Sequence, residues 1–146
     1  MNMNHLTSRA ILCNNSDQIL IVRDQNSDYW GLPGGGIESS ETPLEGLMRE
    51  IKEEVSLNRS PSSFELIGVE YRKEEHSSEV IFVFNGGVLS EKEIINILPA
   101  NEIGEAKFMH LTEAYKLLTP GMVRRLSAIF SHGLKKAVYL ENGQEL

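Results

Sequence analysis

The sequence predicts an α/β domain built on a mixed β-sheet, and three observations support this class. Short apolar stretches bounded by polar turn residues recur along the chain, which is typical of strands. A long amphipathic segment at residues 43–55 has helical periodicity and lies between strand-like segments. Further helical periodicity follows near the C-terminus, at residues 112–132. Strands on both sides of a central helix favour a mixed sheet packed against helices.

Length and composition narrow the classes of protein. At 146 residues the chain predicts a single domain, residues 1–146, with room for a real core. The formal net charge of −7 argues against binding to a nucleic acid polymer, which needs a basic surface. The single cysteine, Cys13, excludes an intrachain disulfide and fits a reducing compartment. Because no segment resembles a secretion signal or a membrane span, we expect a cytoplasmic protein that binds no membrane.

The N-terminal part predicts a β-hairpin followed by a glycine turn. Residues 9–13 and 18–23 have the composition of strands, and the polar segment 14–17 between them suits a turn. Residues 24–28 then form a polar loop. The glycines at 34–36 let the backbone turn and come close to a ligand or to another strand.

The helix at residues 43–55 has a well-marked start. Thr42 suits the N-cap, Pro43 the first helical position, and Glu45 completes a capping box with Thr42. Glu45 and Arg49 are also spaced for an i,i+4 ion pair. Five apolar residues share one stripe that should face the core: Leu44, Leu47, Met48, Ile51 and Val55.

Beyond this helix the pattern returns to strands. Residues 64–71 and 79–85 read as two strands joined by a charged loop at 72–78, and Gly86-Gly87 should end the second strand. A short strand is expected at 105–110. The sheet therefore receives strands from both sides of the helix.

The C-terminal third is less regular. Residues 90–97 fit a short turn or a strand equally well. Residues 112–118 and 121–132 predict helices, the second ended by Gly133. The polar residues 141–146 should form a frayed tail.

Three carboxylates gather on the helix at residues 43–55. Glu50, Glu53 and Glu54 have i, i+3 and i+4 spacing, so they lie close together beside the apolar stripe. Like charges this close repel one another unless a cation lies among them, and hard cations such as Mg²⁺ prefer oxygen ligands. The alternative is a solvated acidic face, which is common on helices.

The segment from Gly35 to Leu57 resembles the Nudix box, G-x5-E-x7-R-E-U-x-E-E-x-G-U, where U is a bulky aliphatic residue. One position departs from the pattern, since Ser56 stands where a glycine is expected to end the helix. The preceding residues 30–35 also resemble the family's W-x-L-P-G-G lead-in. The matching positions are Gly35, Glu41, Arg49, Glu50, Ile51, Glu53, Glu54 and Leu57.

This resemblance implies a Nudix-type α/β/α sandwich with a mixed β-sheet and the Nudix-box helix. It also implies hydrolysis of the pyrophosphate linkage in a nucleoside diphosphate derivative, with Mg²⁺ or Mn²⁺ as the cofactor. A nucleoside triphosphate is one candidate substrate. By resemblance, Glu53 and Glu54 are the main metal ligands and Glu50 is a further ligand or supports them. Arg49 would orient this cluster by pairing with Glu41 or with a carboxylate of the helix.

The general base varies in this family, and the candidates here are Glu53 and a glutamate outside the box. Glu102 is our choice for the latter and Glu105 the alternative, because a loop entering a strand can bring a carboxylate over the metal site. A solvated acidic loop is the competing interpretation.

Substrate contacts are expected from both charged and glycine residues. Arg9 and Arg23 could donate paired hydrogen bonds to phosphates, although surface ion pairs would explain them as well. Gly34 and Gly35 should bring the backbone close to the substrate. Trp30 could stack on a base or be an aromatic residue at the edge of the core.

Two other functions remain open at this stage. The chain could be a non-catalytic nucleotide-binding or regulatory module on the same fold, or an acidic interaction protein whose helix mimics the box. The partners that we expect are a small-molecule nucleotide and, as an open alternative, a second copy in a homodimer. Signatures of the ADP-ribose, dinucleoside polyphosphate and coenzyme A subgroups are absent from the sequence.

Overall fold

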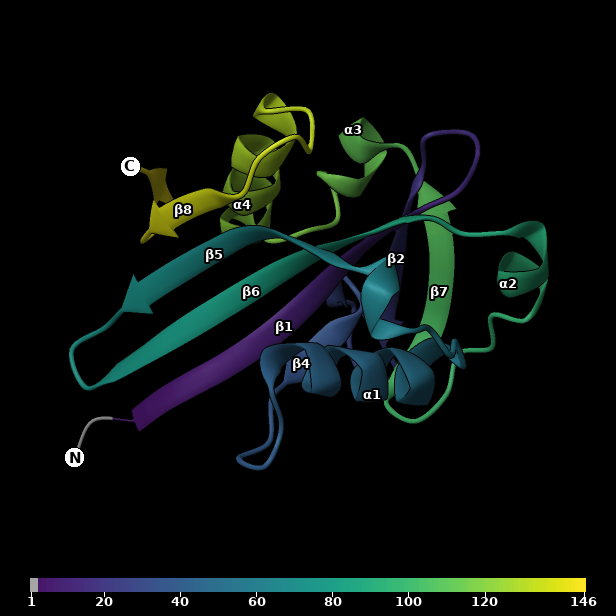
Figure 1. Ribbon diagram of the computed structural model, residues 1–146, viewed down its shortest axis with the longest axis horizontal. Helices are drawn as coiled ribbons and strands as arrows, with labels where there is room; N and C mark the ends of the chain where they lie inside the picture. The colour runs from purple at the N-terminus through teal and green to yellow at the C-terminus, as the bar shows by residue number, and fades with distance from the viewer. Residues whose placement is uncertain (1–2) are drawn as a thin grey trace.

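The computed structural model describes residues 3–146 and shows a mixed β-sheet with helices against both faces (Figure 1). The long central strands β1 (Met3–Cys13) and β6 (Ser77–Val88) run parallel to each other. β6 pairs on its other side with β5 (Glu65–Lys73) in the antiparallel direction. The sheet thus combines both pairings, and the predicted α/β class is confirmed.

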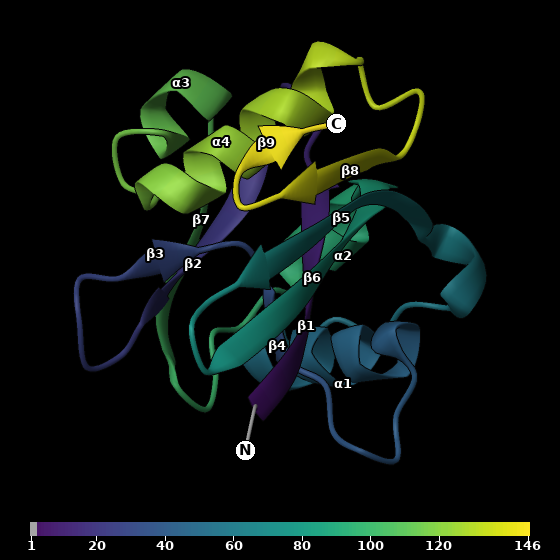
Figure 2. The same cartoon turned by 90° about the vertical axis from the view of Figure 1, so that its left-hand side faces the viewer.

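The remaining strands extend this sheet at its two ends (Figure 2). β2 (Ile19–Asp24) is antiparallel to β1, which confirms the predicted N-terminal hairpin. Two further strands pair with β2 and one with β1: β3 (Trp30–Gly31), β7 (Ile103–Met109) and β4 (Gly34–Gly36). At the other end, β8 (Val138–Glu141) is parallel to β5 and antiparallel to β9 (Gln144–Glu145).

Helices cover the sheet from opposite sides. Helix α1 (Pro43–Val55) packs on one face, whereas α3 (Leu111–Ala114) and α4 (Pro120–Ser131) pack on the other. A short helix α2 (Glu91–Ile95) and a 3₁₀ turn (Pro61–Ser63) lie in the connections. Within residues 3–146 no helix is both long and apolar enough to span a membrane.

Two hydrophobic cores fill the spaces between the sheet and these helices. β1 contributes to both, since successive side chains of a strand point to opposite faces. Ala10 and Leu12 pack in the core under α1, and Ile11 packs in the core under α4. On α1 the predicted apolar stripe faces its core, with Leu47, Ile51 and Val55 buried.

The start of α1 follows the sequence prediction in detail. The Thr42 hydroxyl accepts the Glu45 amide (3.2 Å), and the Glu45 carboxylate accepts the Thr42 amide (2.9 Å). Pro43 is the first helical residue. The expected Glu45–Arg49 ion pair is absent among the described ion pairs, because Glu45 completes the cap and Arg49 turns to other carboxylates.

The structure corrects four expectations. Residues 90–97 form helix α2, and its capping box between Ser90 and Glu93 was the missed signal. β6 does not end at the two glycines but continues to Val88, because a register shift against β1 leaves Gly86 unpaired. The charged loop between β5 and β6 is shorter than the predicted residues 72–78, since β5 ends at Lys73 and β6 begins at Ser77. The C-terminal residues form a hairpin instead of a frayed tail, because Asn142 and Gly143 have the positive φ values of a hairpin turn.

Candidate active site

The predicted functional residues meet in a pocket between β1, β4, α1 and the loop before β7. The lining is mostly polar, and glycine backbone forms one wall. Most of the residues singled out from the sequence belong to this lining: Arg9, Gly34, Gly35, Glu50, Glu54 and Glu102. An adjoining pocket is lined by Glu53 and Asn101 together with the same three glutamates. Residues up to 93 positions apart in the chain thus share one acidic cavity.

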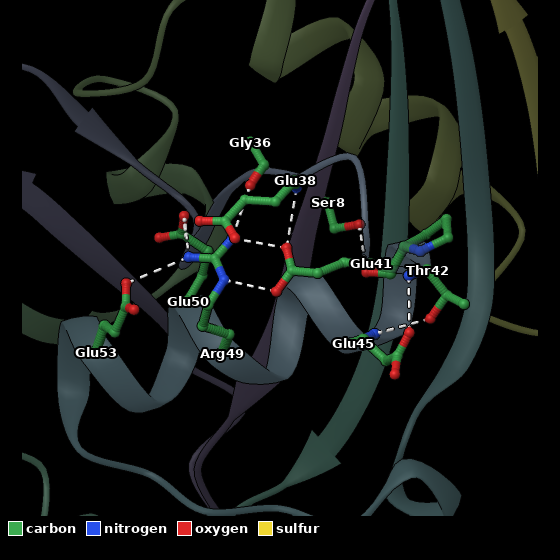
Figure 3. A network of polar contacts seen from close by, with 10 residues as sticks. Ser8, Gly36, Glu38, Glu41, Thr42, Glu45, Arg49, Glu50 and Glu53 are labelled. Carbon is green, nitrogen blue, oxygen red and sulfur yellow. Dashed lines mark hydrogen bonds and ion pairs between the residues drawn. The ribbon is translucent and has the colours of Figure 1, made fainter.

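Arg49 organises the acidic face of α1 (Figure 3). Its Nε and Nη2 donate to the two oxygens of Glu41 (2.7 and 3.0 Å), and Nη2 also donates to the Gly36 carbonyl (3.0 Å). Its Nη1 lies 3.1 Å from Glu50 Oε1 and 3.3 Å from Glu53 Oε2. The bond to Glu41 raises the pKa of Arg49 further and lowers that of Glu41. One guanidinium therefore joins the turn after β4 to two carboxylates of the helix.

Glu54 is held on the other side of the pocket. Its Oε1 accepts the Gly34 amide at 2.8 Å. Burial raises the pKa of Glu54 to about 7, and the charges of Glu50 and Glu102 act in the same direction. The Gly34 amide and the charge of Arg9 oppose this increase. Burial also raises the pKa of Glu50. The pocket thus concentrates partly desolvated carboxylates whose ionised forms lack sufficient positive charge nearby.

Gly34 in the pocket wall cannot carry a side chain. It has φ +137°, and a Cβ there would lie 2.0 Å from the Ser8 carbonyl oxygen. Real Cβ atoms do not approach backbone atoms so closely, so glycine is needed where β4 passes β1. A Cβ on Gly35 would lie 2.8 Å from the carboxylate of Glu50 and would displace that side chain. This close passage puts the Gly34 amide within reach of Glu54.

The chemistry of these donors fits a divalent cation. Glu50, Glu53 and Glu54 line one cavity, and their oxygens are the ligands that Mg²⁺ and Mn²⁺ prefer. Within residues 3–146, no three acidic, histidine or cysteine side chains already converge as a metal site. Glu50 and Glu53 instead contact Arg49, and Glu54 contacts Gly34. Binding a cation would therefore need side-chain rotations from these contacts.

A loop docked on the C-terminal end of α1 delivers Glu102. The amides of Leu98 and Ala100 donate to the carbonyls of Val55 and Glu54 (3.1 and 2.9 Å), which the helix leaves without internal partners. The Ser56 hydroxyl donates to the Leu98 carbonyl (3.1 Å). A further bond runs from Asn101 Nδ2 to the Glu53 carbonyl (3.2 Å). The loop is thereby attached to the backbone of two expected metal ligands.

Ser56 adopts the conformation that the motif's glycine would favour. Its φ is +64°, in the left-handed region, and its amide donates to the Lys52 carbonyl (3.1 Å). The helix thus ends at the expected place with a residue that strains its backbone there. The serine hydroxyl provides a loop contact that glycine could not make.

Of the remaining candidate residues, Arg9 lines the pocket, whereas Arg23 and Trp30 lie outside it. Arg9 lines the pocket, and its Nη1 donates to the carbonyls of Leu32 and Gly34 (both 3.0 Å). Arg23 does not line it and instead pairs with Glu105 (3.4 Å), the alternative to Glu102. This geometry gives no support to a substrate contact by Arg23. Trp30 is buried, as expected for an aromatic residue at the edge of the core.

Three polar side chains that line these pockets had no assigned role from the sequence. Tyr29 is 51% exposed and lines the pocket beside Arg9. Asp24 lies on the same wall at the end of β2. Asn101 has φ +55°, and a left-handed asparagine in a loop is the type of residue that caps neighbouring backbone. Tyr29 and Asp24 belong to an ordinary polar loop in the sequence, so no local pattern marks them.

Comparisons with known proteins agree with this architecture. The solved MutT proteins of Methanosarcina mazei and Bacillus halodurans superpose with TM-scores of 0.71 and 0.69, each at 23% identity. These alignments cover 92% and 97% of this chain and 98% and 94% of the MutT chains. At this identity the likeness establishes the fold alone.

Similarity in sequence is confined to a shorter region. Proteins named RNA pyrophosphohydrolase in Marinomonas sp. and Halorhodospira halophila are 48% identical over 58 residues and 40% identical over 62 residues. These matches cover 40% and 42% of this chain but 35% and 33% of the relatives, so about a third of their length is matched. The family model of the NUDIX domain matches residues 3–129, which is most of the chain. The chain therefore belongs to the Nudix family.

Proposed function

We propose that this protein is a Mg²⁺- or Mn²⁺-dependent hydrolase that cleaves the pyrophosphate linkage of a nucleoside diphosphate derivative. The observation that supports this most directly is the acidic pocket, where Glu50, Glu53 and Glu54 gather beside a glycine turn. Raised pKa values at Glu50 and Glu54 indicate that the pocket favours added positive charge. A divalent cation provides such charge and can at the same time hold the oxygens of a pyrophosphate.

In this proposal Glu53 and Glu54 hold the cation, assisted by Glu50. The cation would offset the charge of the pyrophosphate and lower the pKa of the attacking water. Glu50 and Glu53 would have to leave Arg49 to hold the cation, and the bidentate bond to Glu41 would keep Arg49 in place. Arg9 lines the same pocket and has donors for phosphate oxygens.

The proton of the attacking water needs a carboxylate acceptor. Glu102 lines both halves of the acidic cavity, and the docked loop holds its backbone beside α1. Water oxygen would bond to phosphorus, the bridging P–O bond would break, and the released proton would pass to Glu102. Glu53 remains the alternative base, since it lies in the same cavity.

A nucleotide is the substrate class that we favour, with a nucleoside triphosphate as one candidate. A triphosphorylated RNA end is a second candidate, because relatives that match part of this chain are named RNA pyrophosphohydrolase. Both substrates carry the same reactive linkage. The net charge of −7 disfavours broad contact with an RNA backbone, so short RNA ends fit this candidate better.

The test is a screen of nucleoside diphosphate derivatives and short triphosphorylated RNAs with Mg²⁺ or Mn²⁺, measuring released phosphate and pyrophosphate. Glu53→Gln and Glu54→Gln should each lower kcat by about 100-fold or more, because each removes a proposed metal ligand. Glu65→Gln is the matched control, since Glu65 is exposed at the start of β5, away from the pocket.

Full activity in both glutamine variants would refute the metal assignment. Nucleotide binding by the wild-type protein without product release would instead favour the non-catalytic module. Each variant should unfold in a single cooperative transition with the far-UV circular dichroism spectrum of the wild type, which shows that the fold survives.

A further inference from the structure

A groove lined by arginines adjoins the acidic pocket on the side of α4. Three residues define this arginine groove: Arg9 from β1, Arg72 from β5 and Arg125 from α4. Arg9 and Tyr29 line both the groove and the acidic pocket, so the two are continuous. Carboxylates thus occupy one end of the joint cavity, and guanidinium groups occupy the other.

The arginine groove reverses the overall charge of the protein locally. Glu79 lines it and accepts the Thr7 hydroxyl (2.9 Å), and Glu70 pairs with Arg125 (2.6 Å). Three positive groups therefore face two negative ones, which leaves an excess of one positive charge in a chain with net charge −7. A local excess of this sign attracts an anion.

Several guanidinium donors in the arginine groove remain available. Among the described residues, no hydrogen bond or ion pair engages the side chain of Arg72. Arg125 uses Nε for Glu70, and the described structure shows no partner for its terminal nitrogens. Every fully buried side-chain nitrogen or oxygen in the described residues has a hydrogen-bond partner. The terminal nitrogens of Arg125 have no such partner, so they keep some contact with solvent. Arg72 and Arg125 both line the groove and both keep donors without a described partner, so the groove offers guanidinium N–H groups to a bound anion.

The size of the arginine groove limits its occupant. Its volume is about 90 Å³. A groove of this size lined by guanidinium groups suits a small tetrahedral anion such as a phosphate group. Planar guanidinium groups also match phosphate oxygens in paired hydrogen bonds.

We propose that the arginine groove binds a phosphate group of the substrate other than the pyrophosphate that is cleaved. This inference rests on the proposed function, because it assumes that the pyrophosphate lies in the acidic pocket. The extra phosphate belongs either to the 2′ position of a nucleotide or to the 3′ position, where RNA continues. Arg72 is the main specificity residue, since Arg125 is already engaged by Glu70.

A binding experiment without metal tests this directly, because it needs no hydrolysis. Calorimetric titration in EDTA compares AMP with adenosine 2′,5′-bisphosphate and adenosine 3′,5′-bisphosphate. At least one bisphosphate should bind the wild-type protein about tenfold more tightly than AMP does, by charge-assisted hydrogen bonds. Arg72→Gln should remove most of this preference and leave the affinity for AMP within about twofold.

Lys73→Gln is the matched control. It removes the same charge from the neighbouring position of β5, where the exposed side chain points to the opposite face of the strand. This variant should keep the full preference. The bisphosphate that is preferred identifies the position of the extra phosphate.

Equal affinities for AMP and both bisphosphates would overturn the proposal, as would a preference that survives in Arg72→Gln. Loss of the preference in Lys73→Gln would also overturn it, because the effect would then be one of overall charge. A preference that depends on Arg72 in a protein without hydrolytic activity would support the groove and refute the proposed function alone.

Discussion

At the scale of single residues, Glu54 is a carboxylate that is both partly buried and close to other carboxylates. Its carboxylate is half-buried and accepts the Gly34 amide, yet it lies near the charges of Glu50 and Glu102. Burial therefore raises its pKa to about 7, so in the metal-free protein Glu54 keeps its proton at pH values where an ordinary glutamate is ionised. A bound cation would displace this proton, which couples metal affinity to pH.

This shift predicts how stability depends on pH without metal. The protonated form stabilises the fold fully below the ordinary pKa of 4.5, and this contribution is lost as pH rises through about 7. At about 1.36 kcal/mol per pKa unit, the loss amounts to at most about 3 kcal/mol. Glu54→Gln cannot undergo this loss. Its free energy of unfolding relative to wild type should therefore rise by about 2–3 kcal/mol between about pH 5 and about pH 8 in EDTA.

Urea unfolding of both proteins at the two pH values measures this difference, and titrating groups that do not interact with Glu54 cancel in the comparison. A difference that stays constant with pH would contradict the raised pKa. Adding Mg²⁺ should raise the melting temperature of wild type but not of Glu54→Gln, because a ligand that binds the folded state stabilises it.

The three carboxylates of α1 were predictable as a group because helical spacing places them together. Their individual environments were not predictable. Glu53 remains exposed while Glu54 is half-buried, and the difference arises from β4, which passes over one side of the helix. Of the two arginines predicted to contact substrate, Arg9 lines the pocket and Arg23 pairs with Glu105, because strand position alone does not tell which neighbour a side chain meets.

At the scale of elements, α1 and the loop before β7 act as one unit. Backbone and side-chain hydrogen bonds join the last turn of α1 to residues 98–101, and Glu102 follows directly. Ser56 is central to this junction, since it ends the helix in a left-handed conformation and binds the loop with its hydroxyl.

Two substitutions at Ser56 separate its backbone and side-chain effects. Ser56→Ala removes the hydrogen bond and keeps the left-handed strain, so the free energy of unfolding should fall by about 1 kcal/mol. Ser56→Gly also removes the bond but relieves the strain, and should be more stable than Ser56→Ala by about 1 kcal/mol. Urea unfolding measures both changes. Equal stability of the two variants would show that the φ of +64° carries no strain.

The bounds of a helix or strand can be predicted from the sequence where several local signals agree. The range of α1 was predicted correctly because a capping box, a proline and an apolar stripe all agree. Helix α2 has its own capping box at Ser90 and Glu93, but its five residues are too short for a clear periodicity. The C-terminal hairpin had a local signal in Asn142-Gly143, and its pairing with β5 depends on a distant strand.

At the scale of the whole molecule, the sheet lies between two hydrophobic cores, and each of its faces carries a different functional surface. The face toward α1 carries the acidic helix, and the face toward α4 carries the arginine groove. The strongest polar link across the second face is the buried pair of Glu70 on β5 and Arg125 on α4, whose side chains are 3% and 9% exposed.

Removing one partner of this pair should destabilise the fold strongly. Glu70→Ala leaves a buried guanidinium without its carboxylate, so the free energy of unfolding should fall by about 3–5 kcal/mol. The double variant Glu70→Leu with Arg125→Leu should recover most of this loss, because neither charge then remains buried. Thermal and urea unfolding measure both. A loss below about 1 kcal/mol in Glu70→Ala would show that Arg125 reaches solvent easily.

The sequence by itself determined the fold class, the position of α1 and the acidic cluster on it, because short-range periodicity and capping act within a few residues. The Nudix motif added the glycine turn and the candidate metal ligands. Only the tertiary structure decided that Glu102 joins these ligands, that Arg23 does not line the pocket, and that Arg9, Arg72 and Arg125 share one groove. These outcomes depend on which strands pair and which helix covers each face, and such long-range contacts leave little trace in local sequence.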